Sequence, residues 1–476
     1  MNSIETDYLI VGAGAAGMAF ADALIADSDA DAVVVDRRHR PGGHWNDAYP
    51  FVRLHQPSAF YGVNSRMLGG NSIDNSGPNA GSYERATAAQ ICDYYQTVLD
   101  DCLLASGRVR FFGMCDCAID GSGDRQFTSR LTGETTTVRV RRKVVDARYL
   151  EASIPATHRP SFRAEQGVRL IPVNDLVTLT EPPDGYTVIG SGKTAMDACI
   201  WLLDSGVPPQ MIRWIKPRDA WLLDRAYQQP LDLVDSLIEG VSLYVEAAAE
   251  AEDIGDLFRR LEACRQLRRI DTSVEPEMYR CATVSESELT SLRRIENVVR
   301  QGRVLRIESD QVVLGKGSIR GDTGHVYVDC TAAGLRMAPG RPVFEPGLIT
   351  LQAIRSCQPT FSAALAGYAE ASRDDDADKN RLCPPNPYPD SAADWIATTS
   401  ISVRAQDLWL RDPELTKWLD RSRLNAACGV RDHLTEPRMK SALNRMFAST
   451  EKAITNLDSF LAQGQVRRAS AGSRHR

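Results

Sequence analysis

The sequence predicts an α/β protein with two Rossmann-like dinucleotide-binding domains, a helical insertion and a helical C-terminal region. Two observations lead to this prediction. A glycine-rich turn follows an apolar run almost at the start of the chain, and a second turn of the same kind lies near residue 190. Each turn continues into a stretch with helical periodicity and then into another apolar run. This is the order of strand, turn, helix and strand that a dinucleotide-binding unit has.

The first unit contains the parts that such a site requires, in the expected order. Its first strand, its helix and its second strand are predicted at residues 7–11, 15–26 and 33–35. Gly12 permits the sharp turn, Gly14 lets a pyrophosphate approach the backbone, and Gly17 lets the helix pack closely on the strand. The start of the helix then directs free N–H groups at the phosphates. Asp36 follows the second strand, where a carboxylate accepts the hydrogens of a ribose diol.

The second unit repeats this design with Gly190, Gly192 and Ala195 at the three fingerprint positions. Its strands and the helix between them are predicted at residues 186–189, 211–215 and 194–203. The Gly-Lys-Thr segment also resembles the end of the phosphate-binding loop of a nucleoside triphosphatase, but that loop requires a glycine where this chain has Thr187. We therefore expect a dinucleotide on this turn, in contact with Gly190, Ser191, Gly192, Lys193 and Thr194.

The residues after the second strand of this unit set the nicotinamide preference. A carboxylate there binds the ribose 2′-hydroxyl of NADH, whereas a basic residue accommodates the 2′-phosphate of NADPH. The chain reads Lys216-Pro217-Arg218 before the first acid, Asp219. This turn predicts NADPH, with Lys216 and Arg218 at the 2′-phosphate. A solvated basic turn with no binding role is the alternative.

Two units about 180 residues apart, the first acidic and the second basic at the strand end, resemble the flavoproteins that bind FAD first and NADPH second. Further segments are similar to the flavin-containing (class B) monooxygenases. Gly42-Gly43-His44-Trp45 is similar to the Gly-Gly-x-Trp segment with which that family lines FAD. Residues 53–61 are similar to the loop that the family uses beside the flavin ring. The resemblance covers roughly residues 5–70 and 160–225.

The resemblance implies which residues bind FAD and which ones are catalytic. Those expected at FAD are Gly12, Gly14, Ala16, Gly17, Asp36, Arg37, Gly43, His44, Trp45 and, where the chain returns to the flavin, Gly334. Gln56 corresponds to an Asn that the family often has near the reactive edge of the flavin ring. We expect Gln56, His55 and Arg53 to be catalytic, with His44 and His55 as candidate proton donors.

The implied function is that of an FAD-dependent oxidoreductase that uses NADPH. The main hypothesis is a monooxygenase that oxygenates a small molecule through a C4a-(hydro)peroxyflavin. The family's linker signature, Phe-x-Gly-x-x-x-His, is not present after Phe162, which reduces the support for Baeyer–Villiger chemistry. One alternative is therefore a flavin-dependent dehydrogenase, reductase or oxidase that inserts no oxygen. Another is a non-catalytic flavin-binding redox sensor.

The chain is long enough for two or three domains. We expect the first part of an FAD-binding domain at 1–158, an NADPH-binding domain at 159–325 with a helical insertion at about 228–300, the return to the FAD domain with a C-terminal helical region at 326–464, and a disordered basic tail at 465–476.

Composition limits the cell compartment and the partners. The net charge of −6 gives no reason to expect nucleic acid or an anionic membrane as a partner. Eleven cysteines, an odd and scattered set, predict reduced thiols and a cytoplasmic location, and no pair has the CxxC or CxxxxC spacing of a disulfide reductase. The seven histidines do not cluster at ligand spacing, so no metal site is predicted. The expected partners are a small-molecule substrate and molecular oxygen, and the sequence admits a homodimer.

Overall fold

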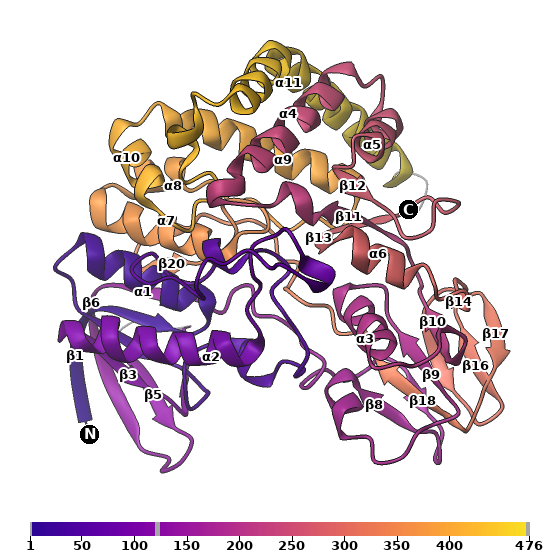
Figure 1. Cartoon of the computed structure of the whole chain (residues 1–476). Coiled ribbons are helices and arrows are strands. Elements are labelled where there is room, and N and C mark those ends of the chain that lie inside the picture. The colour runs from indigo at the N-terminus through magenta and orange to yellow at the C-terminus, as the bar shows by residue number, and fades with distance from the viewer. Residues whose placement is uncertain (1, 120–123, 473–476) are drawn as a thin grey trace.

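The computed structural model describes residues 2–119 and 124–472, which form two α/β units beside a layer of helices (Figure 1). The first sheet has the strand order β19-β20-β6-β1-β2-β3. These strands are β1 (Asn2–Val11), β2 (Ala32–Val35), β3 (Val109–Phe112), β6 (Thr135–Asp146), β19 (Phe344–Glu345) and β20 (Leu348–Thr350). β4 (Cys115–Cys117) and β5 (Arg125–Ser129) extend this sheet through β6. β1 runs parallel to β2 and β6, so that Ile10 lies beside Val34 and Val145.

Helices that are far apart in the sequence complete the first unit. α1 (Ala15–Asp27) packs against α7 (Pro359–Ser372), and most residues of both helices are buried. Gly367 permits this close contact, because a Cβ atom there would lie 2.7 Å from the Phe20 carbonyl oxygen. α2 (Ala88–Thr97) begins at a capping box formed by Thr87 and Gln90.

The second unit is a parallel sheet with the order β14-β10-β9-β18-β8. The strands are β8 (Leu170–Pro172), β9 (Gly185–Ile189), β10 (Ile212–Ile215), β14 (Val298–Val299) and β18 (His325–Asp329). α3 (Lys193–Asp204) follows β9 as α1 follows β1. The parallel sheet and the helix confirm the predicted fold class for this part of the chain.

A smaller sheet lies at the edge of the second unit (Figure 1). Its order is β17-β16-β15-β7, with strands β7 (Arg163–Ala164), β15 (Val304–Ile307), β16 (Gln311–Leu314) and β17 (Gly317–Arg320). Buried side chains of this sheet, among them Ile307 and Val312, form a separate core cluster with Ile189 and Ile215 of the parallel sheet.

The insertion differs from the expected all-helical segment because it also contains strands. Its helices are α4 (Val234–Glu250), α5 (Ile254–Ala263) and α6 (Glu286–Leu292). Between them, β12 (Leu267–Arg268) and β13 (Met278–Val284) pair with β11 (Ala220–Asp224), which lies just before the insertion. The chain therefore forms a three-stranded sheet, two strands of which lie in the region that we expected to be helical.

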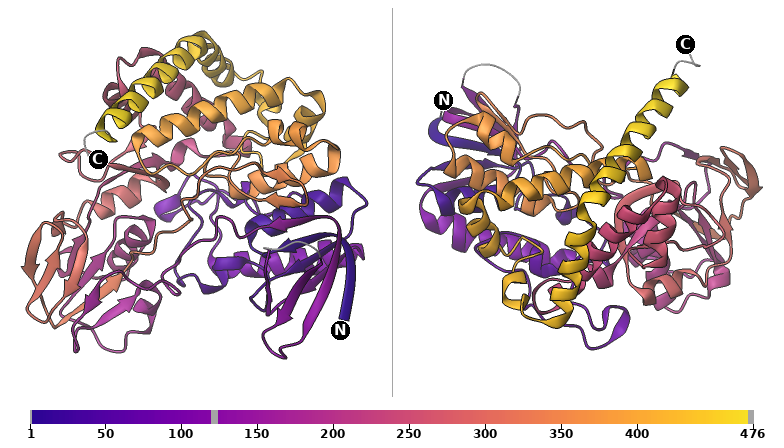
Figure 2. Two further views of the ribbon diagram at one scale, coloured as in Figure 1. Left: turned by 180° about the vertical axis from the view of Figure 1, so that it is seen from behind. Right: turned by 90° about the horizontal axis from the view of Figure 1, so that it is seen from above.

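The C-terminal region is helical, as expected. It contains α8 (Asp376–Leu382), α9 (Ala392–Leu410), α10 (Pro413–Arg421) and α11 (Pro437–Gly472). α11 packs along α4 and α9, and Figure 2 shows it running past both on the outside of the helical layer. The helix includes residues 465–472, which we had expected to be disordered, and residues 473–476 of the expected tail lie outside the described residues. No described helix is both long and apolar enough to cross a lipid bilayer.

Candidate functional site

The first glycine turn has the geometry that its sequence predicts. Gly12 has a φ of 111°, a conformation that favours glycine, and its N–H donates to the Val35 carbonyl oxygen at 2.8 Å. A Cβ atom on Gly17 would lie 1.9 Å from the Gly12 carbonyl oxygen. Only glycine at position 17 therefore lets α1 begin this close to the end of β1.

Gly14 and Gly43 lie side by side near this turn, and neither carries a side chain. A Cβ atom on Gly43 would lie 2.8 Å from the Cα of Gly14, so the two backbones are close together. Gly14 is the N-cap residue of α1, and among the described residues no side chain caps this helix start. The N–H groups of the first turn are therefore free to bind an anion.

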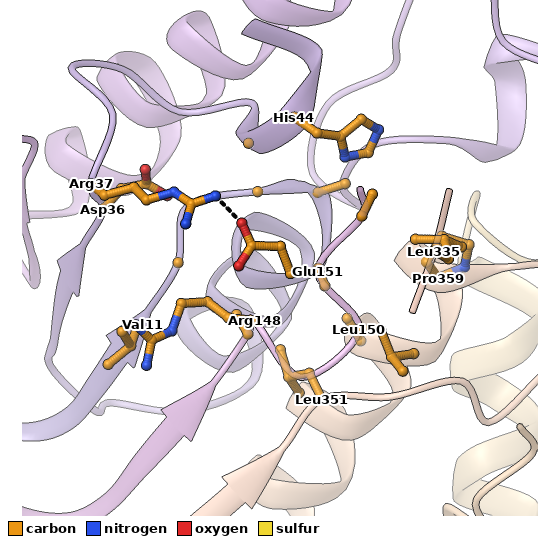
Figure 3. Close-up of a pocket in the computed structure, with 18 of the residues that line it drawn as sticks. Val11, Asp36, Arg37, His44, Arg148, Leu150, Glu151, Leu335, Leu351 and Pro359 are labelled. Carbon is orange, nitrogen blue, oxygen red and sulfur yellow. Dashed lines mark hydrogen bonds and ion pairs between the residues drawn. The ribbon is translucent and has the colours of Figure 1, made fainter. Parts of the chain in front are cut away.

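The end of the first sheet encloses a cavity of about 200 Å³ (Figure 3). Seven of the residues that we expected at FAD line it: Gly12, Gly14, Ala16, Asp36, Arg37, Gly43 and His44. Leu335 and Pro359 line the side away from Asp36 and come from the segments that return to the first unit. The cavity is therefore built from the N-terminal part of the chain (residues 11–152) together with a later part (residues 335–388).

Asp36 is held in place by backbone donors. Its side chain is buried and accepts hydrogen bonds from the Ala13 N–H at 2.6 Å and the Arg38 N–H at 2.7 Å. The neighbouring Arg37 forms an ion pair with Glu151 across the cavity, as Figure 3 shows. A carboxylate held this way is suited to accept hydrogens from a ribose, as the sequence predicts.

His44 lies at the cavity, whereas Trp45 is directed elsewhere. Burial, with a smaller effect of the Arg38 charge, lowers the pKa of His44 to about 4. The ring is therefore neutral near pH 7, and it can donate only a neutral N–H. The indole Nε1 of Trp45 donates to the Tyr61 hydroxyl at 2.7 Å, which holds the Tyr61 ring that lines the cavity.

The three residues expected to be catalytic are not part of the described cavity lining. Arg53 is exposed, and its guanidinium donates to the Arg85 carbonyl oxygen at 3.1 Å. His55 and Gln56 are half-buried. Burial, with a smaller effect of the Lys193 charge, lowers the pKa of His55 to about 4, so this ring is also neutral near pH 7.

The second glycine turn repeats the geometry of the first. Gly190 has a φ of 144°, and a Cβ atom there would lie 2.5 Å from the Cys330 carbonyl oxygen. Its N–H donates to the Ile215 carbonyl oxygen at 3.0 Å. Gly192 is the N-cap of α3, no described side chain caps the helix, and a Cβ atom on Gly192 would meet no described atom within 4 Å. The start of α3 is thus open to an anion.

Lys193 links this turn to the first unit. Its ammonium pairs with Asp197 one turn along α3, and Asp197 accepts a hydrogen bond from the Tyr49 hydroxyl at 2.7 Å. Tyr49 is buried and belongs to the loop after Trp45. Thr194 and Ser191, the other residues expected at this turn, are half-buried beside Lys193.

Glu288 of the insertion lies among three cations from different segments. Its carboxylate pairs with Arg225 at 2.6 Å, with Arg85 at 3.4 Å and with Lys193 at 4.0 Å. Burial raises the pKa of Glu288, but the charges of Lys193, Arg225 and Arg85 outweigh it, and the pKa falls to about 2. This cluster joins the first unit, the second unit and the insertion.

The two residues expected at a 2′-phosphate have different surroundings. The Lys216 ammonium is buried, pairs with Asp219 at 2.6 Å and lies over the Trp214 ring. Burial lowers the pKa of Lys216 although Asp219 opposes this effect. Arg218 is half-buried and pairs with Asp390 at 3.1 Å. Only Arg218 of these two is open enough to meet a ligand without a rearrangement.

Arg300 is a candidate that the sequence analysis missed. It follows β14, which lies beside β10 in the sheet, and its Nε donates to Asp219 at 2.8 Å. The carboxyl ends of neighbouring parallel strands meet at one edge, so Arg300 lies near the turn that contains Arg218. The short run Val298-Val299 before it was the only signal in the sequence. Glu288 was also missed, although Ser285 and Glu288 have the spacing of a capping box.

Gly334 lies where the chain returns to the first unit. It has a φ of 73° and exchanges two backbone hydrogen bonds with Ser153, at 2.8 and 3.1 Å. The next residue, Leu335, lines the cavity. Gly334 therefore holds the returning segment beside the first unit, next to the cavity wall.

The expectation that the cysteines are reduced is wrong for one pair. Cys281 and Cys357 form a disulfide, with their Cα atoms 6.2 Å apart. The described free cysteines include Cys92, Cys199 and Cys330, all buried. The pair could not be recognised from spacing because 76 positions separate the two residues.

Comparisons with known proteins give a family model, close relatives and distant structures. A family model for an NAD(P)-binding Rossmann-like domain matches residues 10–62. The uncharacterized protein Rv2000 of Mycobacterium tuberculosis (strain ATCC 25618 / H37Rv) and the uncharacterized protein Mb2023 of Mycobacterium bovis are each 46% identical to this chain over 447 residues, which is 94% of this chain and 82% of theirs.

Two of the solved structures found are monooxygenases. An open crystal structure of cyclohexanone monooxygenase has a TM-score of 0.49 and 14% identity, and it covers 77% of this chain and 88% of its own. Polycyclic ketone monooxygenase from Thermothelomyces thermophila has a TM-score of 0.49 and 12% identity, with 95% and 90% covered. At such low identity, function must be argued from this chain's own residues.

Proposed function

This chain belongs to the family of the uncharacterized mycobacterial proteins Rv2000 and Mb2023, and we propose that it is an FAD- and NADPH-dependent oxidoreductase. The observation that carries this proposal is the pair of uncapped helix starts, α1 and α3, each at a glycine turn after a parallel strand. Two dinucleotides need two such anion sites, and a single-cofactor enzyme needs only one.

The residues of the first unit fit FAD. Gly12, Gly14 and Gly43 line the cavity without side chains, which leaves their backbone open to the close approach of a pyrophosphate. Asp36 is suited to the ribose of the adenosine. FAD bound here would supply hydride acceptance and oxygen activation, chemistry that no amino-acid side chain provides.

The second unit fits NADPH through a set of residues that differs in part from the expected one. Arg218 and Arg300 are half-buried and lie at the strand ends where a 2′-phosphate is bound in such units. Each is paired with a carboxylate, Asp390 or Asp219, so the guanidinium is held in position before a ligand arrives. Lys216 supports this arrangement by holding Asp219 from the buried side.

The proposed reaction is the oxygenation of a small molecule. The chain's own contribution is a set of uncharged side chains in the cavity lining: His44 is uncharged at neutral pH, and Tyr61, Leu335 and Tyr388 also line the cavity. Beside a bound flavin, such side chains would help to exclude water and to protect a reactive oxygen species from decay. A soft nitrogen or sulfur nucleophile, or a ketone, is the substrate class to test first.

One experiment tests the cofactors and the reaction in sequence. The protein is purified, its bound flavin is identified, and NADPH is added without oxygen while the flavin absorbance is followed. We expect bound FAD that NADPH bleaches faster than NADH does. Oxygen is then admitted with catalase absent, and hydrogen peroxide is measured with and without an amine, a sulfide or a cyclic ketone.

For a monooxygenase, an accepted compound should lower the peroxide yield and appear as its oxygenated product. A full peroxide yield with every compound would reject oxygenation in favour of an oxidase. Protein that contains no flavin would reject the whole proposal.

A further inference from the structure

The Cys281–Cys357 disulfide joins β13 to the segment that enters the lining of the proposed flavin cavity at the start of α7. Cys357 lies two residues before Pro359, which lines the cavity at the start of α7. Cys281 lies in β13, and the neighbouring Arg280 donates to the Ala333 carbonyl oxygen at 3.3 Å, two residues before the cavity residue Leu335. The disulfide is therefore linked, through residues close to it along the chain, to Leu335 and Pro359 on the cavity side away from Asp36.

A second contact attaches β13 to this side of the cavity. The Tyr279 N–H donates to the Asp390 carbonyl oxygen at 3.0 Å, and the Arg280 guanidinium pairs with the Asp390 carboxylate. Asp390 lies two residues after Tyr388, another residue of the lining. The two residues before Cys281 are thus bound to Asp390, which lies close along the chain to the cavity residue Tyr388.

The backbone at both cysteines is in an unfavourable conformation. Cys281 has a φ of 56° and Cys357 a φ of 62°, in the left-handed region that residues other than glycine seldom adopt. At Cys281 the pairing of β11 with β13 shifts register between Trp221 and Leu223, so the strand bulges at the cysteine. Such strain persists only where surrounding structure imposes it, and it occurs preferentially at functional sites.

Cys357 lies at the start of α7. It directly precedes Gln358, the N-cap residue of that helix. The Ser356 hydroxyl is 3.4 Å from the Cys357 sulfur. Both cysteines are half-buried rather than sealed in the core.

We propose that Cys281–Cys357 is a redox-active disulfide that accepts two electrons from the flavin of the neighbouring cavity. The sulfur–sulfur bond breaks and takes up two electrons and two protons, which gives two thiols. The reduced flavin that supplies the electrons returns to its oxidised form, and a hydride from NADPH, with one proton from solvent, replaces them. The inference rests on the proposed flavin site, but it adds a second electron acceptor to the one that the proposed reaction uses.

The test counts thiols rather than turnover. The FAD-loaded protein is reduced without oxygen in two ways, with NADPH and by illumination with EDTA. It is then treated with iodoacetamide, and alkylation of each cysteine is measured by peptide mass spectrometry. Protein stripped of FAD and mixed with NADPH is the third sample. We expect both cysteines to be unmodified before reduction, alkylated in the first two samples and unmodified in the third.

Anaerobic titration gives an independent readout. The wild-type protein should take up two electron pairs per flavin before NADPH accumulates, whereas the double variant Cys281→Ser, Cys357→Ser should take up one. Cys264→Ser is the matched control, because Cys264 is a half-buried free cysteine of the same insertion. This control should still take up two pairs.

Each outcome decides between the two proposals. Cysteines that stay unmodified while the flavin bleaches would overturn the redox role but leave the flavin function intact. Alkylation before any reduction would overturn the disulfide itself. Alkylation after illumination but not after NADPH would keep the redox role and overturn NADPH as the donor. Protein without flavin would overturn both proposals.

Discussion

Glu288 is a buried carboxylate whose charge depends on three neighbours. Its pKa of about 2 is below the ordinary 4.5, so its stabilising effect is complete above about pH 4.5 and is lost as the pH falls towards 2. Removing the charge leaves Arg225, Arg85 and Lys193 close together without their common partner. The cost of such a change in a buried cluster is about 3 kcal/mol.

We therefore expect Glu288→Gln to lower the free energy of unfolding by about 3 kcal/mol at pH 7 and by progressively less below pH 4.5. Urea denaturation of both proteins across this pH range measures the difference. Glu286→Gln, an exposed carboxylate on the same helix, is the control and should cost less than about 1 kcal/mol. A difference that is independent of pH would contradict the ionised state of Glu288.

A substitution of Gly14 tests the first dinucleotide site. Its φ of −75° is allowed for any residue, so valine there does not strain the backbone. The branched side chain would instead occupy the space beside Gly43 that we assign to the pyrophosphate. Gly14→Val should purify with less than about a tenth of the wild-type FAD and an unchanged circular dichroism spectrum.

Gly14→Ala is the matched control, because its Cβ atom would lie at an ordinary 3.6 Å from the Gly43 Cα. It should keep more FAD than Gly14→Val. A wild-type FAD content in Gly14→Val would show that Gly14 does not contact the pyrophosphate.

Residues whose role depends on local backbone geometry could be predicted from the sequence. The turns at Gly12 and Gly190 and the acid at Asp36 follow from their spacing to adjacent strands. The charge states of His44 and His55 could not be predicted, because burial by distant segments lowers both pKa values to about 4. For the same reason, the sequence could not show that Lys216 is buried whereas Arg218 is half-buried.

At the scale of elements, the basic edge of the second sheet allows a prediction about cofactor preference. Arg218→Ala and Arg300→Ala should each raise the KM for NADPH roughly tenfold or more and leave that for NADH nearly unchanged, because a charged hydrogen bond to the 2′-phosphate is lost. Steady-state kinetics with both nucleotides measures the change.

Lys216→Met separates binding from stability at the same edge. It removes a buried ammonium and keeps most of its volume, so it should lower the free energy of unfolding more than it changes the NADPH-to-NADH preference. A change in the NADPH-to-NADH preference as large as that of Arg218→Ala would mean that Lys216 contacts the 2′-phosphate.

Long, periodic elements were predictable and short, paired ones were not. α1 and α3 follow the expected ranges within a few residues because their apolar spacing and their glycine turns agree. β12 has two residues, and β13 pairs with β11 from before the insertion, so neither forms a recognisable local pattern. The same holds for Arg300, which becomes part of the site only through the pairing of β14 with β10.

At the scale of the whole molecule, Tyr49 connects the two α/β units through Asp197. Hydride transfer between two cofactors requires that their units keep a fixed distance. Tyr49→Phe should therefore slow the anaerobic reduction of bound flavin by NADPH at least several-fold. The FAD content should stay unchanged, because Tyr49 does not line the described cavity.

Stopped-flow absorbance measures this rate, and Tyr227→Phe, at a half-buried tyrosine just before the insertion, is the control. An unchanged reduction rate in Tyr49→Phe would mean that other contacts between the units set the distance. The sequence could not predict this link or the Cys281–Cys357 pair, because each joins residues that are far apart along the chain.

The packing of α1 against α7 also has a consequence for folding during synthesis. The apolar face of α1 is synthesised first, but the helix that covers it begins at Pro359, and β20 joins β6 only after residue 348. The second unit, in contrast, is complete once β18 has emerged. During synthesis the apolar surface of the N-terminal unit therefore stays uncovered while a later unit folds. This interval is when the nascent protein most needs a chaperone.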